Sequence, residues 1–145
     1  MDWSLEVVSV PVSDIDRAKA FYADQVGFNI DYDSAFSDEY RVVQLTPRGS
    51  GCSITIGTGV WASRSGSPPE LTRMPPGSLR GIQLVVPDIS AARLELLEKG
   101  VDVSEVHHFE DGGWLKGPGG EWNSFAFFSD PDGNGWVLQE SAVRS

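Results

Sequence analysis

The two histidines of the chain stand next to each other and are followed closely by acidic residues. His107 and His108 precede Glu110 and Asp111. An imidazole titrates near neutral pH and can act as a general base, and a nearby carboxylate can orient it. In a strand, alternation sends the two histidines to opposite faces, so at most one of them can face a cavity. The competing interpretation is a pair of surface histidines beside an acidic loop.

Other catalytic arrangements find little support in the spacing of the residues. Cys52 opens a β-type run, where a cysteine is expected to act as a small buried side chain. No Ser-His-Asp or Cys-His arrangement is indicated. The glycine-rich stretch 117–120 lacks the Lys-Ser/Thr pair and the strand-to-helix context of a phosphate-binding loop.

The composition predicts an acidic globular protein. The 145 residues include 11 Lys and Arg against 21 Asp and Glu, which gives a formal charge of −10. Such a surface repels phosphate backbones, so nucleic acid is not an expected partner, whereas cationic ligands are attracted; acidity can also serve solubility alone. No apolar run approaches the ~20 residues of a membrane span. With a single cysteine and no secretory signal pattern, the chain is expected in the cytoplasm.

The elements that would position these residues occur twice along the chain. The first copy has an alternating apolar run at 8–12, Asp14 as a helix cap and a helical pattern that stops at Gly27. The second copy repeats this order, at positions 82–86, Asp88 and Gly100. After each glycine come three β-type runs, at 28–32, 40–45 and 52–57, and then at 101–107, 124–128 and 135–139.

This repeat predicts an α+β protein made of two βαβββ modules. The first module is expected over residues 1–58 and the second over 79–145, together forming one compact domain. Residues 59–78, rich in Ser, Gly and Pro, are expected to form a linker or a flap. A second loop, rich in glycine, is expected at 110–121, and the sequence of residues 130–135 predicts a hairpin turn.

Three motifs carry a resemblance to a known family. They are Val-Pro-Val-Ser-Asp-Ile-Asp-Arg-Ala at 10–18, Phe-Tyr at 21–22 followed by Val-Gly-Phe at 26–28, and Ser-Asp-Pro-Asp-Gly-Asn at 129–134. On these residues the chain resembles the vicinal oxygen chelate superfamily, which includes glyoxalase I, extradiol dioxygenases and bleomycin resistance proteins. The resemblance implies two βαβββ modules that form a curled mixed sheet around a cavity, usually within a homodimer.

The resemblance also points to four strand positions where metal-dependent members carry His, Gln or Glu. In this chain they correspond to Val7, Thr55, Gly81 and Val137. A divalent ion needs imidazole or carboxylate ligands, which valine and glycine lack, and a threonine hydroxyl is a feeble ligand on its own. We therefore expect no metal and no other cofactor in this site.

Strand alternation indicates which side chains line the cavity instead. Ser9 and Thr55 are expected to face it in the first module, and Gln83 and Gln139 in the second. Hydroxyls and amides can orient a ligand by hydrogen bonds, although the two glutamines can equally pair with each other. Three tryptophans of glycine-rich loops can stack on a planar ligand or fill a dimer interface; they are Trp61, Trp114 and Trp122.

Three functions stay open at this point. We favour a metal-free binding protein of the bleomycin-resistance type that sequesters an aromatic or cationic small molecule. The second is a metal-independent lyase or isomerase acting on a small carbonyl metabolite, with His107 or His108 as base and Gln83 or Gln139 steering an oxygen. The third is a metal-dependent glyoxalase or dioxygenase with ligands elsewhere, for example His108 with Glu110.

Overall fold

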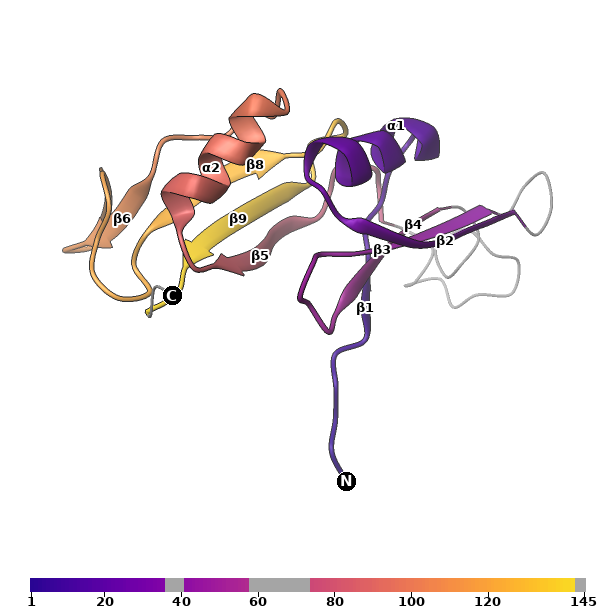
Figure 1. The fold of residues 1–145 in the computed structure, drawn as a ribbon, viewed down its shortest axis with the longest axis horizontal. Coiled ribbons are helices and arrows are strands. Elements are labelled where there is room, and N and C mark those ends of the chain that lie inside the picture. The colour runs from indigo at the N-terminus through magenta and orange to yellow at the C-terminus, as the bar shows by residue number, and fades with distance from the viewer. Residues whose placement is uncertain (36–40, 58–73, 143–145) are drawn as a thin grey trace. The chain divides into compact units, whose positions relative to one another are not determined.

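The computed structural model describes residues 1–35, 41–57 and 74–142 of the chain (Figure 1). The chain divides into two compact units. The first comprises 1–79 together with the short segment 131–134, and the second comprises 80–130 and 135–145. Trp61 and most of the expected linker lie outside the described residues.

The first unit contains a helical segment and a four-stranded mixed sheet. Its strand order is β1-β4-β3-β2, in which β1 and β4 are parallel and the other neighbours antiparallel. The elements are β1 (Val7–Ser9), α1 (Ile15–Ala20), η1, a π-helical turn (Phe21–Gln25), β2 (Asn29–Ala35), β3 (Arg41–Thr46) and β4 (Ser53–Gly57).

The helix of the first unit begins and ends as its sequence predicts. The Asp14 carboxylate accepts a hydrogen bond from the backbone N–H of Arg17 at 3.1 Å, which satisfies a donor of the first helical turn. Gly27 follows the last turn with a φ of 88°, a conformation that glycine adopts without strain. Between them Tyr22 is fully buried and stacks on Phe28, with ring centroids 5.8 Å apart.

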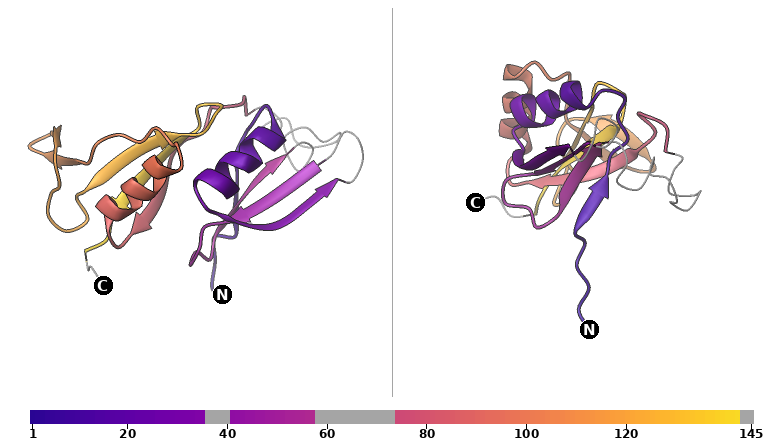
Figure 2. Two further views of the ribbon diagram at one scale, coloured as in Figure 1. Left: turned by 45° about the horizontal axis from the view of Figure 1, so that its top comes forward. Right: turned by 90° about the vertical axis from the view of Figure 1, so that its right-hand side faces the viewer.

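The second unit contains one helix and a five-stranded mixed sheet of order β5-β9-β8-β6-β7, in which β5 and β9 are parallel. Asp88 caps the helix by accepting from the N–H of Ala91 at 3.1 Å, as predicted. The helix covers one face of the sheet (Figures 1 and 2). The elements are β5 (Arg80–Val86), α2 (Ile89–Glu98), β6 (His107–Glu110), β7 (Gly113–Lys116), β8 (Phe125–Ser129) and β9 (Gly135–Glu140).

Two sequence predictions for the second unit are wrong. The run 101–107 is not a strand, since it contributes an isolated bridge at Val103 and a regular strand starts only at His107. The predicted loop 110–121 contains strand β7, which forms a hairpin with β6. The turn of that hairpin is Asp111-Gly112, with φ of 50° and 80°. Positive φ at both central residues is the geometry that matches the twist of a hairpin.

The turn between β8 and β9 belongs to the first unit, although both strands belong to the second. Asn134 is fully buried in it. Its Nδ2 donates to the carbonyl of Pro11 at 2.8 Å, and its Oδ1 accepts from the N–H of Leu79 at 3.1 Å. The predicted turn therefore has a structural role beyond joining two strands. Across the described part of the chain, none of the helices has the length and hydropathy required to cross a membrane.

Candidate functional site

The face of the second sheet opposite α2 carries exposed apolar side chains. Along β8 and β9, Ala126, Phe128, Trp136 and Leu138 are buried, so the residues between them project from the other face. We call that surface the open face. Its residues are Gln83, Val85, His107, Phe109, Trp114, Phe125, Phe127, Val137 and Gln139.

Trp114 is the centre of an aromatic cluster on the open face. Its indole ring makes edge-to-face contacts with three phenylalanine rings, with centroid distances of 5.4, 5.3 and 5.6 Å to Phe109, Phe125 and Phe127. Such contacts fix ring orientation. Trp114 nevertheless keeps 51% of its surface exposed and Phe109 keeps 48%. The cluster is therefore an ordered aromatic surface that is available for stacking.

The two predicted amides lie together on the same face. Gln83 Nε2 donates to Gln139 Oε1 at 2.8 Å. The two glutamines thus pair with each other, which is one of the two alternatives for them. Gln139 Nε2 in turn donates to the backbone carbonyl of Trp122 at 2.8 Å. Trp122 has a φ of 60°, which is unusual for a bulky residue, and is 48% exposed. The structure thus links three of the predicted ligand-binding residues.

The loop before β8 is anchored at several points, which limits how far Trp122 can move. The side chain of Asn123 bonds both the N–H and the carbonyl of Phe109, each at 2.9 Å. The N–H of Gly119 donates to the buried Ser124 hydroxyl at 3.0 Å. A Cβ at Gly119 would meet the carbonyl oxygen of Asn123 at 2.3 Å, so only glycine allows this close approach.

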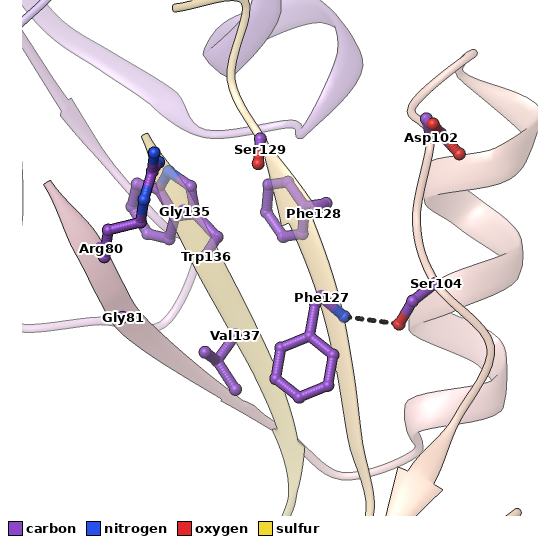
Figure 3. Close-up of a pocket in the computed structure, with 10 residues that line it drawn as sticks. All are labelled: Arg80, Gly81, Asp102, Ser104, Phe127, Phe128, Ser129, Gly135, Trp136 and Val137. Carbon is purple, nitrogen blue, oxygen red and sulfur yellow. Dashed lines mark hydrogen bonds between the residues drawn. The ribbon is translucent and has the colours of Figure 1, made fainter. Parts of the chain in front are cut away.

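A pocket of about 590 Å³ opens where β5 and β9 begin and β8 ends (Figure 3). Its wall includes Phe127 and Val137 of the open face, and two glycines, Gly81 and Gly135. Arg80 and Asp102 contribute the charged groups of the wall. Ser104 also lines it, and its hydroxyl is already bonded on both sides, since it donates to the Glu105 carbonyl and accepts from the Phe127 N–H, each at 2.9 Å. The lining is thus mostly apolar with two opposite charges.

Two of the four positions that correspond to metal ligands in the resembled superfamily line this pocket. They are Gly81 and Val137. Gly81 is the extra residue at a register shift in β5 and has a φ of 85°, which an L side chain adopts only with strain. Nothing lies within 4 Å of where its Cβ would be, so the missing side chain leaves open space. Within residues 1–35, 41–57 and 74–142, no three His, Cys, Asp or Glu side chains group as metal ligands would.

The other two positions lie on the sheet of the first unit. Val7 is the register partner of Ser53, and Thr55 that of Ser9. The Ser9 and Thr55 hydroxyl oxygens are 3.3 Å apart, and Thr55 is buried. The structure therefore brings the two predicted hydroxyl residues together, and their side chains are within hydrogen-bond distance of each other.

The two histidines project to opposite faces, as alternation predicts. His107 is the register partner of Phe125 and lies on the open face, with its ring centroid 6.4 Å from that of Phe127. Its Nδ1 lies 2.7 Å from the carbonyl of Glu105, which makes Nδ1 the protonated nitrogen. In the neutral form of the ring, Nε2 is then the nitrogen with a lone pair.

His108 has acceptors at both ring nitrogens. Nδ1 lies 2.8 Å from the carbonyl of Gly117, and Nε2 lies 3.0 Å from the carboxylate of Glu110. Because both partners accept, they stabilise the imidazolium form, and the Gly117 carbonyl followed by the Glu110 carboxylate raises the pKa of His108 above its usual value. Both ring nitrogens of His108 are thus engaged by acceptors, so this geometry fits a role in anchoring the loop.

Sequence reasoning missed the phenylalanines of the open face. Phe125 and Phe127 alternate with buried residues of β8, so the strand period itself was a usable signal once β8 had a helix on one side. Phe109 and its contact with Trp114 required the hairpin, which the expected loop at 110–121 concealed. Arg80 and Asp102 approach the pocket only through the tertiary fold, and no local pattern marks them.

Comparison with known proteins gives one family. The family model described as "Glyoxalase/Bleomycin resistance protein/Dioxygenase superfamily" matches residues 4–138. None of the curated proteins compared with the chain matches it. Many solved structures do match, and the three described next are each similar over almost the whole length of both chains.

The first of these is TnmS3, an antibiotic binding protein from Streptomyces sp. CB03234, which is 33% identical over 97% of both chains with a TM-score of 0.69. A glyoxalase/bleomycin resistance protein from the same organism is 36% identical over 94% of this chain and 99% of that chain, with a TM-score of 0.66. A superfamily member from Sphaerobacter thermophilus DSM 20745 is 28% identical over 97% and 98%, with a TM-score of 0.70.

Proposed function

The chain belongs to the Glyoxalase/Bleomycin resistance protein/Dioxygenase superfamily, and from this premise we propose that it is a metal-free protein that binds an aromatic small molecule on the open face of its second sheet. The observation that carries the proposal is the half-exposed Trp114, held edge-on by three phenylalanine rings. Exposed aromatic surface that is already ordered binds a flat ligand at little cost in side-chain entropy.

The pocket next to the cluster supports the same proposal. Its volume of about 590 Å³ falls in the range of sites for small organic ligands. Gly81 and Val137, which stand where metal-dependent relatives carry ligands, supply backbone and apolar surface there. A ligand that stacks on Phe127 can extend into this space without meeting a metal centre.

Similarity to TnmS3 supports binding as the function. That protein is described as an antibiotic binding protein, and the present chain shares a third of its residues with it. We extend the proposal accordingly to sequestration of an aromatic compound of antibiotic type. The formal charge of −10 favours ligands that also carry a positive charge.

A metal-independent enzyme that uses His107 is the second candidate. It is favoured by one observation, the position of the His107 ring on the open face beside Phe127. A carbonyl substrate stacked on the cluster would lie near an imidazole whose Nε2 can accept a proton. Turnover of the bound compound by the wild-type protein, abolished in His107→Ala, would select this candidate over simple binding.

The principal test combines a binding screen with metal analysis. Protein purified without chelator is titrated with flat fluorescent compounds, for example proflavine, ethidium and hydroxypyrene, and then again after EDTA treatment. We expect saturable binding by at least one compound, the same affinity after EDTA, and less than stoichiometric zinc, nickel or iron. Binding that depends on a stoichiometric metal contradicts the metal-free proposal, and no binding across a broad aromatic set contradicts the proposed ligand class.

Two further parts of the proposal concern assembly and compartment. We propose a homodimer, the assembly that the family resemblance implies, and expect sedimentation equilibrium to give twice the 15.7 kDa chain mass. We propose the cytoplasm as the compartment because a single cysteine fits a reducing environment. A monomeric mass at micromolar concentration would contradict the first of these.

A further inference from the structure

The hydrogen bonds that join Gln83, Gln139 and Trp122 have a fixed direction. A backbone carbonyl can only accept, so the Gln139 atom 2.8 Å from the Trp122 oxygen must be Nε2. The other branch of the Gln139 amide is then Oε1, which needs a donor. Gln83 supplies that donor with its own Nε2, at 2.8 Å. The single carbonyl of Trp122 therefore sets the orientation of both amides.

This direction determines which atom Gln83 presents to the open face. With Nε2 turned to Gln139, its Oε1 points away from that partner. A flipped Gln83 would place two acceptor oxygens against each other at hydrogen-bond distance, which is unfavourable. For the side chain of Gln83, the described part of the protein shows one hydrogen bond, the one to Gln139. Its Oε1 is thus an oriented acceptor on a surface with few polar groups.

The neighbours of Gln83 make this acceptor selective. Val137 is its register partner on β9, and Phe127 is the register partner of Val137 on β8. Val85 lies two residues further along β5 and is 55% exposed. A flat ligand that covers these apolar side chains also removes water from Gln83 Oε1. The ligand must then supply a hydrogen-bond donor or leave the oxygen without a partner, which is unfavourable in an apolar contact.

The backbone of Trp122 indicates that this arrangement is held in place. Its φ of 60° is rarely adopted by a bulky residue and persists only where surrounding contacts enforce it. The bond from Gln139 and the anchors of Asn123 on Phe109 are such contacts. The carbonyl that orients both amides is therefore itself fixed before a ligand arrives.

We propose that the open face selects aromatic ligands that carry a hydroxyl or amino hydrogen donor, which bonds to Gln83 Oε1, and that Gln139 is a positioning residue that keeps this oxygen directed at the ligand. The proposal rests on the proposed function, since it names the ligand class of the same site. A site built to bond a donor rejects an analogue that lacks it far more strongly than an apolar site does.

The test uses two neutral probes, hydroxypyrene and methoxypyrene, which differ in one hydrogen donor. We expect the wild-type protein to bind hydroxypyrene roughly tenfold more tightly, the change expected for one hydrogen bond in an apolar contact. In Gln83→Leu the preference disappears, because leucine has similar size and no amide. Gln44→Leu, the matched change on β3 of the first unit, keeps the preference.

A second variant separates positioning from support of the fold. In Gln139→Leu the Gln83 amide is free to turn, so we expect the ratio of the two probe affinities to fall towards one. A merely structural role for Gln139 would weaken both probes by the same factor and leave the ratio unchanged, which contradicts the positioning role. Thermal unfolding of each variant shows whether the fold is retained.

The outcomes distinguish this proposal from the proposed function. If both probes bind equally and Trp114→Ala abolishes both, the open face binds aromatic ligands but the donor selectivity is overturned. A preference for hydroxypyrene that survives in Gln83→Leu overturns the role of Gln83. If neither probe binds, the donor selectivity is overturned, and the proposed function is overturned with it only where proflavine, ethidium and the wider aromatic set also fail to bind.

Discussion

Ser13 and Asp132, which are 119 positions apart in the chain, share a short hydrogen bond. Ser13 Oγ donates to Asp132 Oδ1 at 2.5 Å, and the Ser13 N–H donates to Oδ2 at 3.1 Å. Arg17 adds an ion pair at 3.2 Å to a carboxylate whose side chain is 8% exposed. The turn 131–134 is thereby bonded to the start of the first helical segment.

We predict that Ser13→Ala destabilises the protein by about 1–2 kcal/mol, the contribution of a hydrogen bond to a charged group. Chemical denaturation with urea measures the change. Ser4→Ala, in the exposed tail before β1, is the control and is expected to have little effect. Equal stability of the two variants would show that the Ser13 bond contributes nothing measurable.

The carboxylate of Asp132 should also make the stability of the protein depend on pH in the acid range. Burial acts to raise the pKa of Asp132, but the bonds from Ser13 and the charge of Arg17 outweigh it and lower that pKa below its usual value of 3.8. A lowered folded-state pKa contributes stability that is present above pH 3.8 and is lost as the pH falls through the folded-state value. The difference in unfolding free energy between wild type and Ser13→Ala should therefore shrink in acid; a constant difference down to about pH 2 would contradict it.

His108 should make a contribution to stability that decreases, not increases, as the pH rises near neutrality. Because its folded-state pKa is raised above 6.5, its charged form contributes stability that is complete below pH 6.5 and is lost as the pH rises through the folded-state value. Glu110→Gln removes the negative charge that stabilises the imidazolium, so it should lower stability more at about pH 5.5 than at about pH 8.5. Urea denaturation at both values tests this. Glu121→Gln, in the loop before β8, is the control; a pH-independent effect of Glu110→Gln would rule out coupling to His108.

Trp114→Ala should weaken binding of an aromatic probe by about tenfold or more, because it removes the centre of the aromatic cluster. The fold should persist, since half of Trp114 is exposed. Fluorescence titration with hydroxypyrene measures the affinity. Trp3→Ala is a matched control, because Trp3 is 89% exposed in the N-terminal segment before β1. If both variants lose the same affinity, the open face is not the site.

Gly81→Ala should lower stability by about 1 kcal/mol through backbone strain alone. Its φ is 85°, while nothing within 4 Å would obstruct the added methyl group. Gly135→Ala is the comparison, since its Cβ would meet the flexible side chain of Arg80 at 3.4 Å and no positive φ is involved. Thermal unfolding shows which of the two variants is less stable. A larger loss of stability in Gly135→Ala than in Gly81→Ala would contradict the strain argument.

Local signals in the sequence predicted the repeated elements correctly. Asp14 and Asp88 cap helices because their carboxylates reach free N–H groups three residues ahead, a contact that depends on neighbouring residues only. Gly27 and Gly100 end the helical segments with positive φ. The alternation of strands also placed Gln83 and Gln139 on one face, and His107 and His108 on opposite faces.

The errors arose where structure depends on pairing between distant residues or on a turn type. The Asp111-Gly112 pair is a strong signal for a two-residue hairpin, but the glycine-rich composition around it outweighed that signal and concealed β7. The position of Trp114 against Phe125 and Phe127 follows from that hairpin. The direction of the Gln83 amide could not be predicted, because it is set by a carbonyl in a loop whose path no local pattern determines.

The turn between β8 and β9 belongs to a different unit from its two strands, and this affects how the chain reaches its native state. The first unit is incomplete until residues 131–134 have been synthesised, since Asn134 bonds both the carbonyl of Pro11 and the N–H of Leu79. A ribosome-bound nascent chain ending before this turn should therefore remain susceptible to proteases. Two separately expressed fragments, divided between residues 57 and 74, should each be unstable alone and become resistant to digestion when mixed.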